Sequence, residues 1–330
     1  MKHVSIIAEV GSVHDGSFGN AIKLADLAQK LGADAVKYQT HLSEHETRSD
    51  APSPGYFSAE SRYDYFIRTG FSLDQWKQIK LHCDDIGIEF ISSPFSEKAV
   101  EWLDEIGVSR FKIPSGEVTN IPMLEAINSL SRPVILSSGM SNWNELDDAV
   151  KALDNVDLTI MQCTSQYPCP NEHVGLNVIQ EMQNRYNKPI GYSDHTQTNY
   201  AAFAAVTIGV VCVEKHLTFS KAMYGSDAPL ASEPHEFEDL VQGIRAISQI
   251  QAHEIDKDNL EPYSDMKNIF QKSIVAADDI DAGTTLSKEM LAYKKPGTGI
   301  SAANYSQLVG RVTKTTIKKD DLIQYEHLNS

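Results

Sequence analysis

Short apolar runs alternate along this chain with longer segments in which apolar residues recur every three or four positions. Runs bounded by Gly, Ser or Pro are typical of buried strands, and the longer periodic segments are typical of helices. The predicted strands are residues 4–8, 35–38, 88–91, 111–113, 134–136, 158–161, 190–192 and 210–213. The predicted helices are residues 21–31, 73–86, 99–106, 123–130, 143–153, 176–185, 200–208 and 236–250. One helix start, Ser72 followed by Gln75, has the pattern of a capping box.

Eight strand–helix units in about 250 residues are the number and length of a TIM (β/α)8 barrel. A doubly wound parallel sheet is the alternative that the same alternation permits. The spacing is irregular once, where residues 42–70, with prolines and charged flanks, separate the second and third predicted strands. We expect this insertion to form a lid or a partner-contacting loop on the active-site face.

The strand-then-helix pattern ends near residue 250, and short alternating runs such as SIVAADDI and VGRVTKTTI follow. We therefore predict a barrel domain over residues 1–251, a polar linker over residues 252–272 and a small all-β domain over residues 273–330. A domain of this size buries little apolar surface alone, so we expect it to pack on another part of the protein.

The formal net charge of −16 argues against binding to nucleic acid or anionic membranes, because both need a basic surface. No apolar run approaches the length of roughly 18 residues that a membrane span requires. The strand-like sequence VSIIAEV begins at Val4 and leaves no room for a signal peptide, so we expect a cytoplasmic protein.

Polar residues follow each predicted strand, at the edge of the barrel where TIM-barrel active sites lie. Lys37 and Lys112 occur there among many hydroxyl residues, which include Ser92, Ser93, Ser115, Ser137, Ser138, Thr164, Ser165 and Ser193. Positive charge and hydroxyl donors together bind phosphate dianions, so these residues predict a small phosphorylated ligand. A Schiff base on either lysine, as in barrel aldolases, is the chemical alternative.

His195 and His216 follow the last two predicted strands, which a parallel sheet would place side by side. Two imidazoles are too few for a closed structural zinc site, so we predict an open site for a divalent metal that water and substrate complete. Helix capping and burial in the core are the alternatives for each ring. Glu9 and Glu117 also follow predicted strands and are candidates for acid–base catalysis or for binding sugar hydroxyls.

Many stretches match one enzyme family in order. They are IIAEVGSVHDG, GADAVKYQTH, FISSPFS, FKIPSGEVTN, PVILSSGM, QCTSQYPCP, GYSDHT and VEKHLT, followed by KSIVAADDIDAG and KKPGTGIS. From residue 4 to about residue 325 the chain resembles the N-acetylneuraminate (sialic acid) synthases. That family condenses phosphoenolpyruvate with an N-acetylated mannose-type sugar to form nonulosonic acids. The resemblance implies a TIM barrel followed by an antifreeze-like (SAF) domain.

The resemblance also implies a role for each candidate residue. His195 and His216 would hold a divalent metal, Mn²⁺ or alternatively Mg²⁺ or Co²⁺, that polarises the sugar aldehyde. Glu117 would activate the water that adds to the reacting carbon, and Glu9 would act beside it and contact the sugar. The residues that match phosphoenolpyruvate-binding positions are Lys37, Ser93, Lys112, Ser115, Ser137, Ser165 and Ser193. Those that match sugar-binding positions are Gln39, Tyr167, Asp227 and Lys295.

Three places depart from the family pattern: VH at residues 13–14 replaces Asn-His, YGSDA at residues 224–228 replaces Pro-Gly-Pro-Asp-His, and Lys295 replaces an arginine. Because Arg and Lys differ at a planar, multiply hydrogen-bonded site, these departures leave the sugar open. The candidates are N-acetylmannosamine and 2,4-diacetamido-2,4,6-trideoxymannose, the sugar of an N,N'-diacetyllegionaminate synthase.

The resemblance further implies a domain-swapped homodimer in which the small domain of one subunit covers the barrel mouth of the other. Lys295 would then lie in the partner's site. The alternative outside enzymes is a carbohydrate-binding or ice-binding protein that has lost barrel activity. The intact set of two histidines, two lysines and Glu117 argues against such a loss.

Overall fold

The computed structural model describes residues 3–53 and 60–329. One sheet contains β1 (Ser5–Gly11), β2 (Ala35–Thr40), β3 (Glu89–Pro94), β4 (Phe111–Ile113), β5 (Val134–Ser137), β6 (Leu158–Cys163), β7 (Ile190–Asp194) and β8 (Cys212–His216). The strands are parallel in the order β3-β2-β1-β8-β7-β6-β5-β4, and the end strands β3 and β4 also contact each other. The sheet therefore curves into a barrel, which confirms the predicted TIM fold over the doubly wound alternative.

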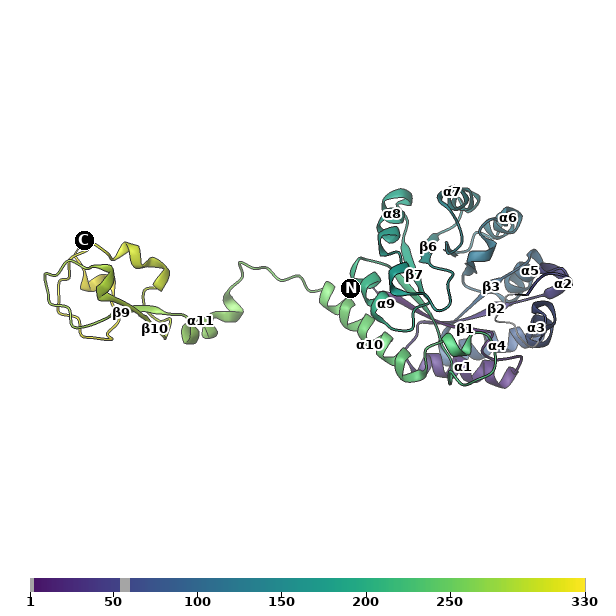
Figure 1. Ribbon diagram of the computed structural model, residues 1–330, viewed down its shortest axis with the longest axis horizontal. Helices are drawn as coiled ribbons and strands as arrows, with labels where there is room; N and C mark the ends of the chain where they lie inside the picture. Colours follow the sequence, from purple (N-terminus) through teal and green to yellow (C-terminus); the bar gives the residue numbers. More distant parts are fainter. Residues whose placement is uncertain (1–2, 54–59, 330) are drawn as a thin grey trace. The chain divides into compact units, whose positions relative to one another are not determined.

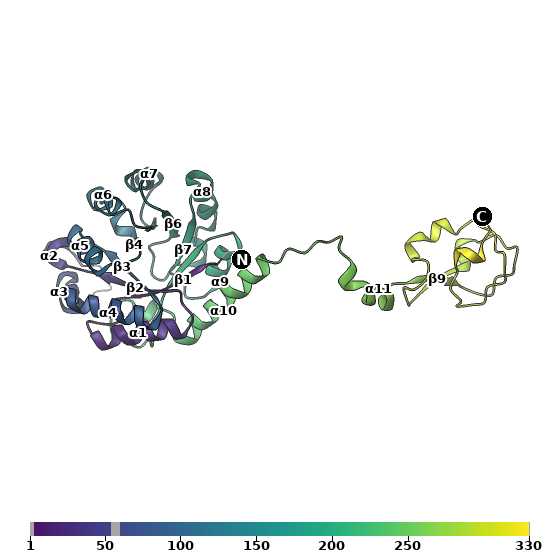
Figure 2. The same ribbon diagram turned by 180° about the vertical axis from the view of Figure 1, so that it is seen from behind.

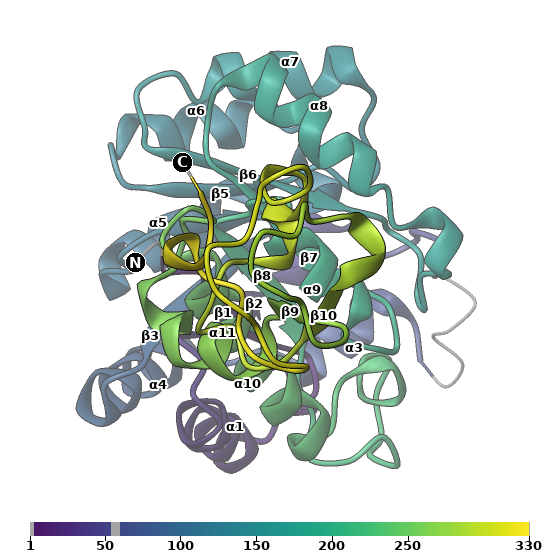
Figure 3. The ribbon, with the colours of Figure 1, turned by 90° about the vertical axis from the view of Figure 1, so that its left-hand side faces the viewer.

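Helices surround the strands on the outside of the barrel. They are α1 (Phe18–Lys30), α4 (Leu73–Ile86), α5 (Glu97–Ile106), α6 (Ile121–Ser129), α7 (Trp143–Ala152), α8 (Leu176–Tyr186), α9 (Tyr200–Thr207) and α10 (Pro234–Gln251). Helices α1 and α4 contact each other, as do α9 and α10 (Figures 1 and 2). Helices α6, α7 and α8 follow one another outside β5 and β6 (Figure 3).

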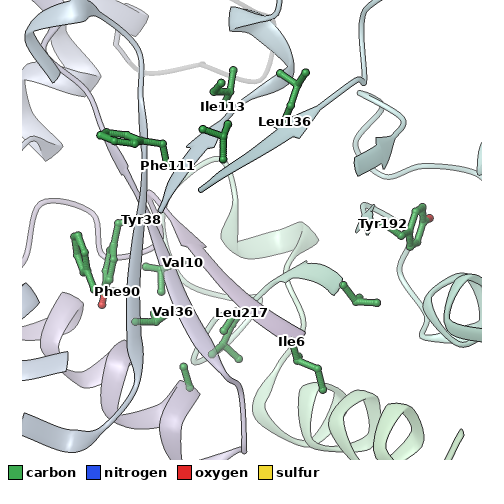
Figure 4. Close-up of a cluster of buried hydrophobic side chains, with 14 of the residues drawn as sticks. Ile6, Val10, Val36, Tyr38, Phe90, Phe111, Ile113, Leu136, Tyr192 and Leu217 are labelled. Atoms are coloured by element: carbon green, nitrogen blue, oxygen red, sulfur yellow. The ribbon is translucent and has the colours of Figure 1, made fainter. Parts of the chain in front are cut away.

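Aromatic side chains in the barrel core pack strands β2 and β3 against each other and against helix α4. Tyr38 of β2 and Phe90 of β3 stack with ring centroids 5.6 Å apart, and their rings lie side by side in Figure 4. Trp76 of α4 meets the Tyr38 ring edge-on at 5.8 Å, which holds the helix against the strands. The predicted capping box of Ser72 and Gln75 is present at the start of α4.

Several strands continue past their predicted ends. The prediction ended each strand at its last apolar residue, but β3 runs on to Pro94 and β8 to His216. Their polar side chains are buried and bind one another: Ser92 Oγ lies 2.7 Å from Thr40 Oγ1, and Lys215 Nζ lies 2.6 Å from Asp194 Oδ2. Because these groups satisfy one another, polar residues can extend the strands into the barrel mouth.

The insertion after β2 contains two helices, α2 (Ser43–Glu46) and α3 (Arg62–Thr69). Residues 54–59 of the predicted insertion lie outside the described residues. Tyr65 of α3 donates a hydrogen bond to Ser12 Oγ at 2.9 Å, so α3 is held against the loop that follows β1. The insertion thus contributes to the barrel mouth, on the face where the sequence predicted it.

The chain divides into two compact units, Met1–Glu254 and Ile255–Ser330. The first unit ends just beyond residue 251, the predicted end of the barrel domain. The second unit contains α11 (Ser264–Phe270), which lies inside the predicted linker, and the antiparallel pair β9 (Ser273–Ala276) and β10 (Leu291–Lys294). Ile274, Leu286 and Ile323 belong to its buried core. The small β-rich fold of the predicted SAF domain is therefore confirmed.

No helix within the described ranges, 3–53 and 60–329, has both the length and the apolar character needed to cross a bilayer.

Candidate active site

A cavity of ≈ 690 Å³ lies at the carboxyl ends of the barrel strands. The predicted site residues that line it are Glu9, Lys37, Gln39, Lys112, Ser115, Glu117, Ser137, Ser165, Tyr167, Ser193, His195, His216 and Asp227. Ser93 is fully buried and contacts Lys37 instead of lining the cavity. Lys295 belongs to the C-terminal unit, where its Nζ lies 4.9 Å from the centre of the Phe270 ring. The barrel fold therefore brings the predicted barrel residues together in one place.

Two buried lysines share a buried carboxylate. Glu214 Oε2 lies 3.7 Å from Lys37 Nζ and 3.5 Å from Lys112 Nζ, and Ser193 Oγ donates to Glu214 Oε1 at 3.1 Å. Lys37 Nζ also lies 2.8 Å from Glu9 Oε2. Two ammonium groups and two carboxylates therefore balance one another in the part of the cavity where β1, β2, β4 and β8 converge.

The charges in this cluster are set by burial and by the neighbouring ions. Burial alone would lower the pKa of Lys37, but Glu214 and Glu9 outweigh it and raise that pKa. Burial lowers the pKa of Lys112 more than Glu214 raises it. Burial would raise the pKa of Glu214, but the two lysines lower it below its usual range. Burial raises the pKa of Glu9. Lys37 and Glu214 are therefore the firmly charged members, and the cluster is suited to exchange a carboxylate contact for an anionic ligand.

Hydroxyl groups extend this charged cluster. Lys112 Nζ donates to Ser137 Oγ at 2.7 Å, and the Gly139 N–H donates to Ser115 Oγ at 3.0 Å. A Cβ on Gly139 would lie 2.4 Å from Ser165 Oγ and 2.6 Å from Ser115 Oγ. No side chain fits there, so the backbone and two hydroxyls form a small polar cradle beside Lys112.

The two histidines lie next to each other, as the parallel strands predicted, with ring centroids 5.9 Å apart. His195 Nδ1 donates to the Thr164 carbonyl at 2.8 Å, and Nε2 lies 3.1 Å from the Tyr167 hydroxyl. His216 Nδ1 is buried and has no hydrogen-bond partner among the described residues. Within residues 3–53 and 60–329, no group of three or more His, Cys, Asp or Glu side chains is arranged to hold a metal. Two neighbouring imidazoles, with His216 Nδ1 available and His195 Nε2 facing only the Tyr167 hydroxyl, fit an open site whose remaining ligands are water or substrate oxygens.

Asp227, in the loop that follows β8, forms hydrogen bonds with Ser12, in the loop that follows β1. Its Oδ2 accepts hydrogen bonds from the Ser12 N–H at 3.0 Å and from Ser12 Oγ at 2.9 Å. A Cβ on Gly11 would lie 2.5 Å from the same oxygen, so only glycine permits this approach. Burial would raise the pKa of Asp227, but His216 and these hydrogen bonds lower it, so the side chain is held as a carboxylate.

Glu117 lines the same cavity from the short turn Ser115–Glu117, which follows β4. Its Oε2 accepts a hydrogen bond from Asn120 Nδ2 at 2.8 Å. Burial raises the pKa of Glu117 despite that hydrogen bond. A carboxylate with a raised pKa can take a proton from water near neutral pH, which suits the predicted base.

Sequence reasoning gave no role to Glu214. The signal was a charged residue between Val213 and Lys215, where an apolar residue would be expected in a barrel strand. Cys163 and His41, which also line the cavity, were not predicted as site residues either. Cys163 Sγ lies 3.9 Å from His195 Nδ1, a contact that depends on the pairing of β6 with β7.

Comparison with known proteins decides the family. Residues 24–256 match the NeuB family and residues 271–329 match the SAF domain. The chain belongs to the NeuB family. The resemblance found in the sequence motifs is therefore confirmed, and the chain is an enzyme of the NeuB type.

Relatives of this NeuB chain match along nearly its whole length. The N,N'-diacetyllegionaminic acid synthase of Campylobacter jejuni is 35% identical, over 98% of this chain and 100% of that protein. The N-acetylneuraminate-9-phosphate synthase of Mus musculus is also 35% identical, over 98% of this chain and 92% of that protein. Among solved structures, the N-acetylneuraminic acid (sialic acid) synthetase of Leptospira borgpetersenii in complex with citrate superposes with a TM-score of 0.71 at 29% identity. That match covers 81% of this chain and 92% of the other.

Proposed function

We propose that this NeuB enzyme condenses phosphoenolpyruvate with an N-acetylmannosamine-type sugar to form a nonulosonic acid, N-acetylneuraminate or a close analogue, and releases phosphate. The observation that carries the proposal is the juxtaposition of two features in one cavity. One is the pair Lys37 and Lys112 around Glu214, and the other is the imidazole pair His195 and His216.

The phosphate of phosphoenolpyruvate is assigned to the lysine side of the cavity. Lys37 and Lys112 supply positive charge, and Ser93, Ser115, Ser137, Ser165 and Ser193 supply hydroxyl groups. The cradle at Gly139 favours this assignment, because it leaves open the space beside two hydroxyls that a side chain would obstruct. Buried, prearranged donors of this kind stabilise phosphate charge without reorganisation during the reaction.

The acceptor sugar is assigned to the histidine side. His195 and His216 would hold the divalent metal, Mn²⁺ or alternatively Mg²⁺ or Co²⁺, which when bound acts as a Lewis acid on the sugar aldehyde. The side chains assigned to the sugar are Gln39, Tyr167 and Asp227. Tyr167 places its hydroxyl 3.1 Å from His195 Nε2, so it is positioned to contact a group bound there.

In the proposed reaction, C3 of phosphoenolpyruvate forms a bond to the aldehyde carbon, and the aldehyde oxygen takes a proton and becomes a hydroxyl. Water adds to C2 of the former phosphoenolpyruvate, with Glu117 accepting its proton. The tetrahedral intermediate then breaks its C–O bond to phosphate, leaving a 2-keto acid and inorganic phosphate. Glu9, beside Lys37, is assigned to orient the sugar and to hold a proton near the reacting atoms.

A Schiff-base mechanism is less compatible with the geometry. A nucleophilic lysine must be neutral, but Lys37 Nζ lies 2.8 Å from Glu9 Oε2 and its pKa is raised. Lys112 has a lowered pKa, so it is the lysine at which the alternative is tested. Borohydride treatment in the presence of substrate is expected to trap no adduct on Lys112.

We further propose a cytoplasmic homodimer in which Lys295 of one subunit meets the sugar in the cavity of the other. The proposal rests on the small size of the C-terminal unit and on the family resemblance of the KKPGTGIS stretch. Gel filtration with light scattering is expected to give twice the chain mass of 36.6 kDa, and a monomer would contradict it.

The decisive experiment is phosphate release from phosphoenolpyruvate by the full-length, Mn²⁺-loaded protein. Three arms are compared: N-acetylmannosamine, 2,4-diacetamido-2,4,6-trideoxymannose, and no sugar. Preference for the first sugar assigns a sialic acid synthase, and preference for the second assigns an N,N'-diacetyllegionaminate synthase. Absence of sugar-dependent release in both arms would contradict the proposed function.

A further inference from the structure

His41 lies immediately beyond the last residue of β2 and is held on all sides. Its ring stacks between Phe66 and Phe95, with centroids 3.5 Å and 3.9 Å away and interplanar angles of 18° and 20°. Only 5% of its side chain is exposed. Nδ1 lies 2.8 Å from Glu46 Oε1, and Nε2 lies 3.0 Å from Gln39 Oε1. The ring therefore has a fixed plane and a defined partner at each nitrogen.

The contact at Nε2 is the first link of a chain that reaches the charged cluster. Gln39 Nε2 donates to Glu9 Oε1 at 2.8 Å, and Glu9 Oε2 lies 2.8 Å from Lys37 Nζ. The Glu9 carboxyl group therefore lies between Lys37 and Gln39, and the Gln39 amide is oriented so that its NH₂ faces Glu9. The amide oxygen then faces His41, and an oxygen requires a donor.

We propose that His41 is a positioning residue: its Nε2–H fixes the amide of Gln39 so that the NH₂ faces Glu9 and the oxygen faces away from it. This inference rests on the proposed function in assigning Gln39 to the acceptor sugar. A reversed amide would exchange a hydrogen-bond donor for an acceptor at one wall of the cavity. A sugar hydroxyl or acyl group bound there would then lose its hydrogen-bond partner.

The partner of Nδ1 is compatible with this arrangement. Glu46 Oε2 accepts the Leu42 N–H at 3.1 Å, which anchors the carboxyl group at the start of α2. Burial lowers the pKa of His41 against the opposing influence of Glu46, so the ring gives up a proton more readily than an exposed histidine. The hydrogen bond at Nδ1 needs one proton between that nitrogen and Glu46 Oε1, and the proposal places a second proton on Nε2, which donates it to Gln39 Oε1.

Replacing His41 by phenylalanine separates packing from hydrogen bonding. Phenylalanine keeps a flat ring between Phe66 and Phe95 but cannot donate to Gln39. We expect kcat/KM for the sugar to fall about tenfold or more, since a buried acceptor without a donor costs roughly a factor of ten in binding. The KM for phosphoenolpyruvate and the thermal midpoint of the full-length protein are expected to stay near their wild-type values.

Two further variants sharpen the test. Glu46→Gln is the conservative change, because its amide can accept from the Leu42 N–H and donate to Nδ1, which leaves Nε2 as the protonated nitrogen. Its loss is expected to stay under about threefold. His82→Phe is the matched control, since it removes an imidazole–carboxylate contact, 2.6 Å to Asp26, far from the cavity on the outer helices.

The result that overturns the proposal is a His41→Phe enzyme with wild-type sugar kinetics, or one in which both substrates and the thermal midpoint are affected alike. A measurement that does not need turnover is the ¹⁵N resonance of His41 Nε2 in the full-length wild-type protein. A protonated Nε2 is expected, and an unprotonated one would refute the assignment. If wild-type protein releases no phosphate with either sugar, the proposed function fails while this resonance still decides the orientation of Gln39.

Discussion

Glu214 is the counter-ion on which the buried lysines depend, and replacing it by glutamine tests that dependence. The side chain is 7% exposed and lies 3.7 Å from Lys37 Nζ and 3.5 Å from Lys112 Nζ. Glutamine keeps the shape and can still accept the hydrogen bond from Ser193. The substitution therefore removes the charge and little else.

The size of the effect follows from these distances. At the effective dielectric constant of about 20 that suits such sites, each contact supplies about 4–5 kcal/mol of attraction. The cost of burying the carboxylate, several kcal/mol, offsets part of the sum. We expect Glu214→Gln to lower the free energy of unfolding by about 3–5 kcal/mol, as for other buried ion pairs that lose one partner.

The assay is urea unfolding followed by tryptophan fluorescence. All three tryptophans, Trp76, Trp102 and Trp143, lie in the barrel unit, so the signal reports that unit alone. Glu105→Gln, which removes an exposed ion pair with Lys77, is the matched control and is expected to leave the transition in place. Inorganic phosphate should restore part of the lost stability, because it binds the folded state and supplies the missing negative charge. Unchanged stability of Glu214→Gln without phosphate would refute the role of Glu214.

Three further predictions test other parts of the account. His14 is buried and its pKa is lowered to about 4, so the unfolded chain binds a proton below pH 6.5 that the folded chain refuses. Stability is therefore expected to fall between pH 6.5 and pH 4, by at most about 1.4 kcal/mol per unit, and His14→Asn should flatten that part of a urea-midpoint profile. Gly139→Ala should raise the KM for phosphoenolpyruvate about tenfold or more, because its Cβ would meet two hydroxyls within 2.6 Å, whereas Gly116→Ala, with 3.7 Å of clearance, should not. His195→Ala and His216→Ala should each lose bound Mn²⁺ on metal analysis, and retention of metal by both would contradict the site.

The sequence alone predicted the repeating strand–helix pattern of the barrel and the polar residues that stand at the ends of its strands. Lys37 and Lys112 each end or interrupt an apolar run, so their place at the barrel mouth followed from the fold class alone. The imidazole pair followed in the same way, because β7 and β8 are consecutive and parallel. These predictions needed only strand order, not side-chain positions.

The remaining features depend on contacts between distant parts of the chain. Glu214 meets Lys112 only because β4 and β8 face each other across the barrel interior, which no spacing along the chain expresses. Asp227 reaches Ser12 across 215 positions, through an approach that Gly11 alone permits. Strand ends were placed too early for a related reason, since buried polar pairs such as Lys215 and Asp194 replace the apolar residues that mark a strand.

The most direct test of the central claim follows the oxygen that joins carbon to phosphorus in phosphoenolpyruvate. Phosphoenolpyruvate labelled with ¹⁸O at that bridging position is turned over by the Mn²⁺-loaded protein with the preferred sugar, and both products are analysed by mass spectrometry. Attack through C3 followed by water addition and C–O cleavage predicts that the label leaves entirely with inorganic phosphate. Label retained in the keto acid would mean that the P–O bond breaks instead, and would contradict the proposed condensation.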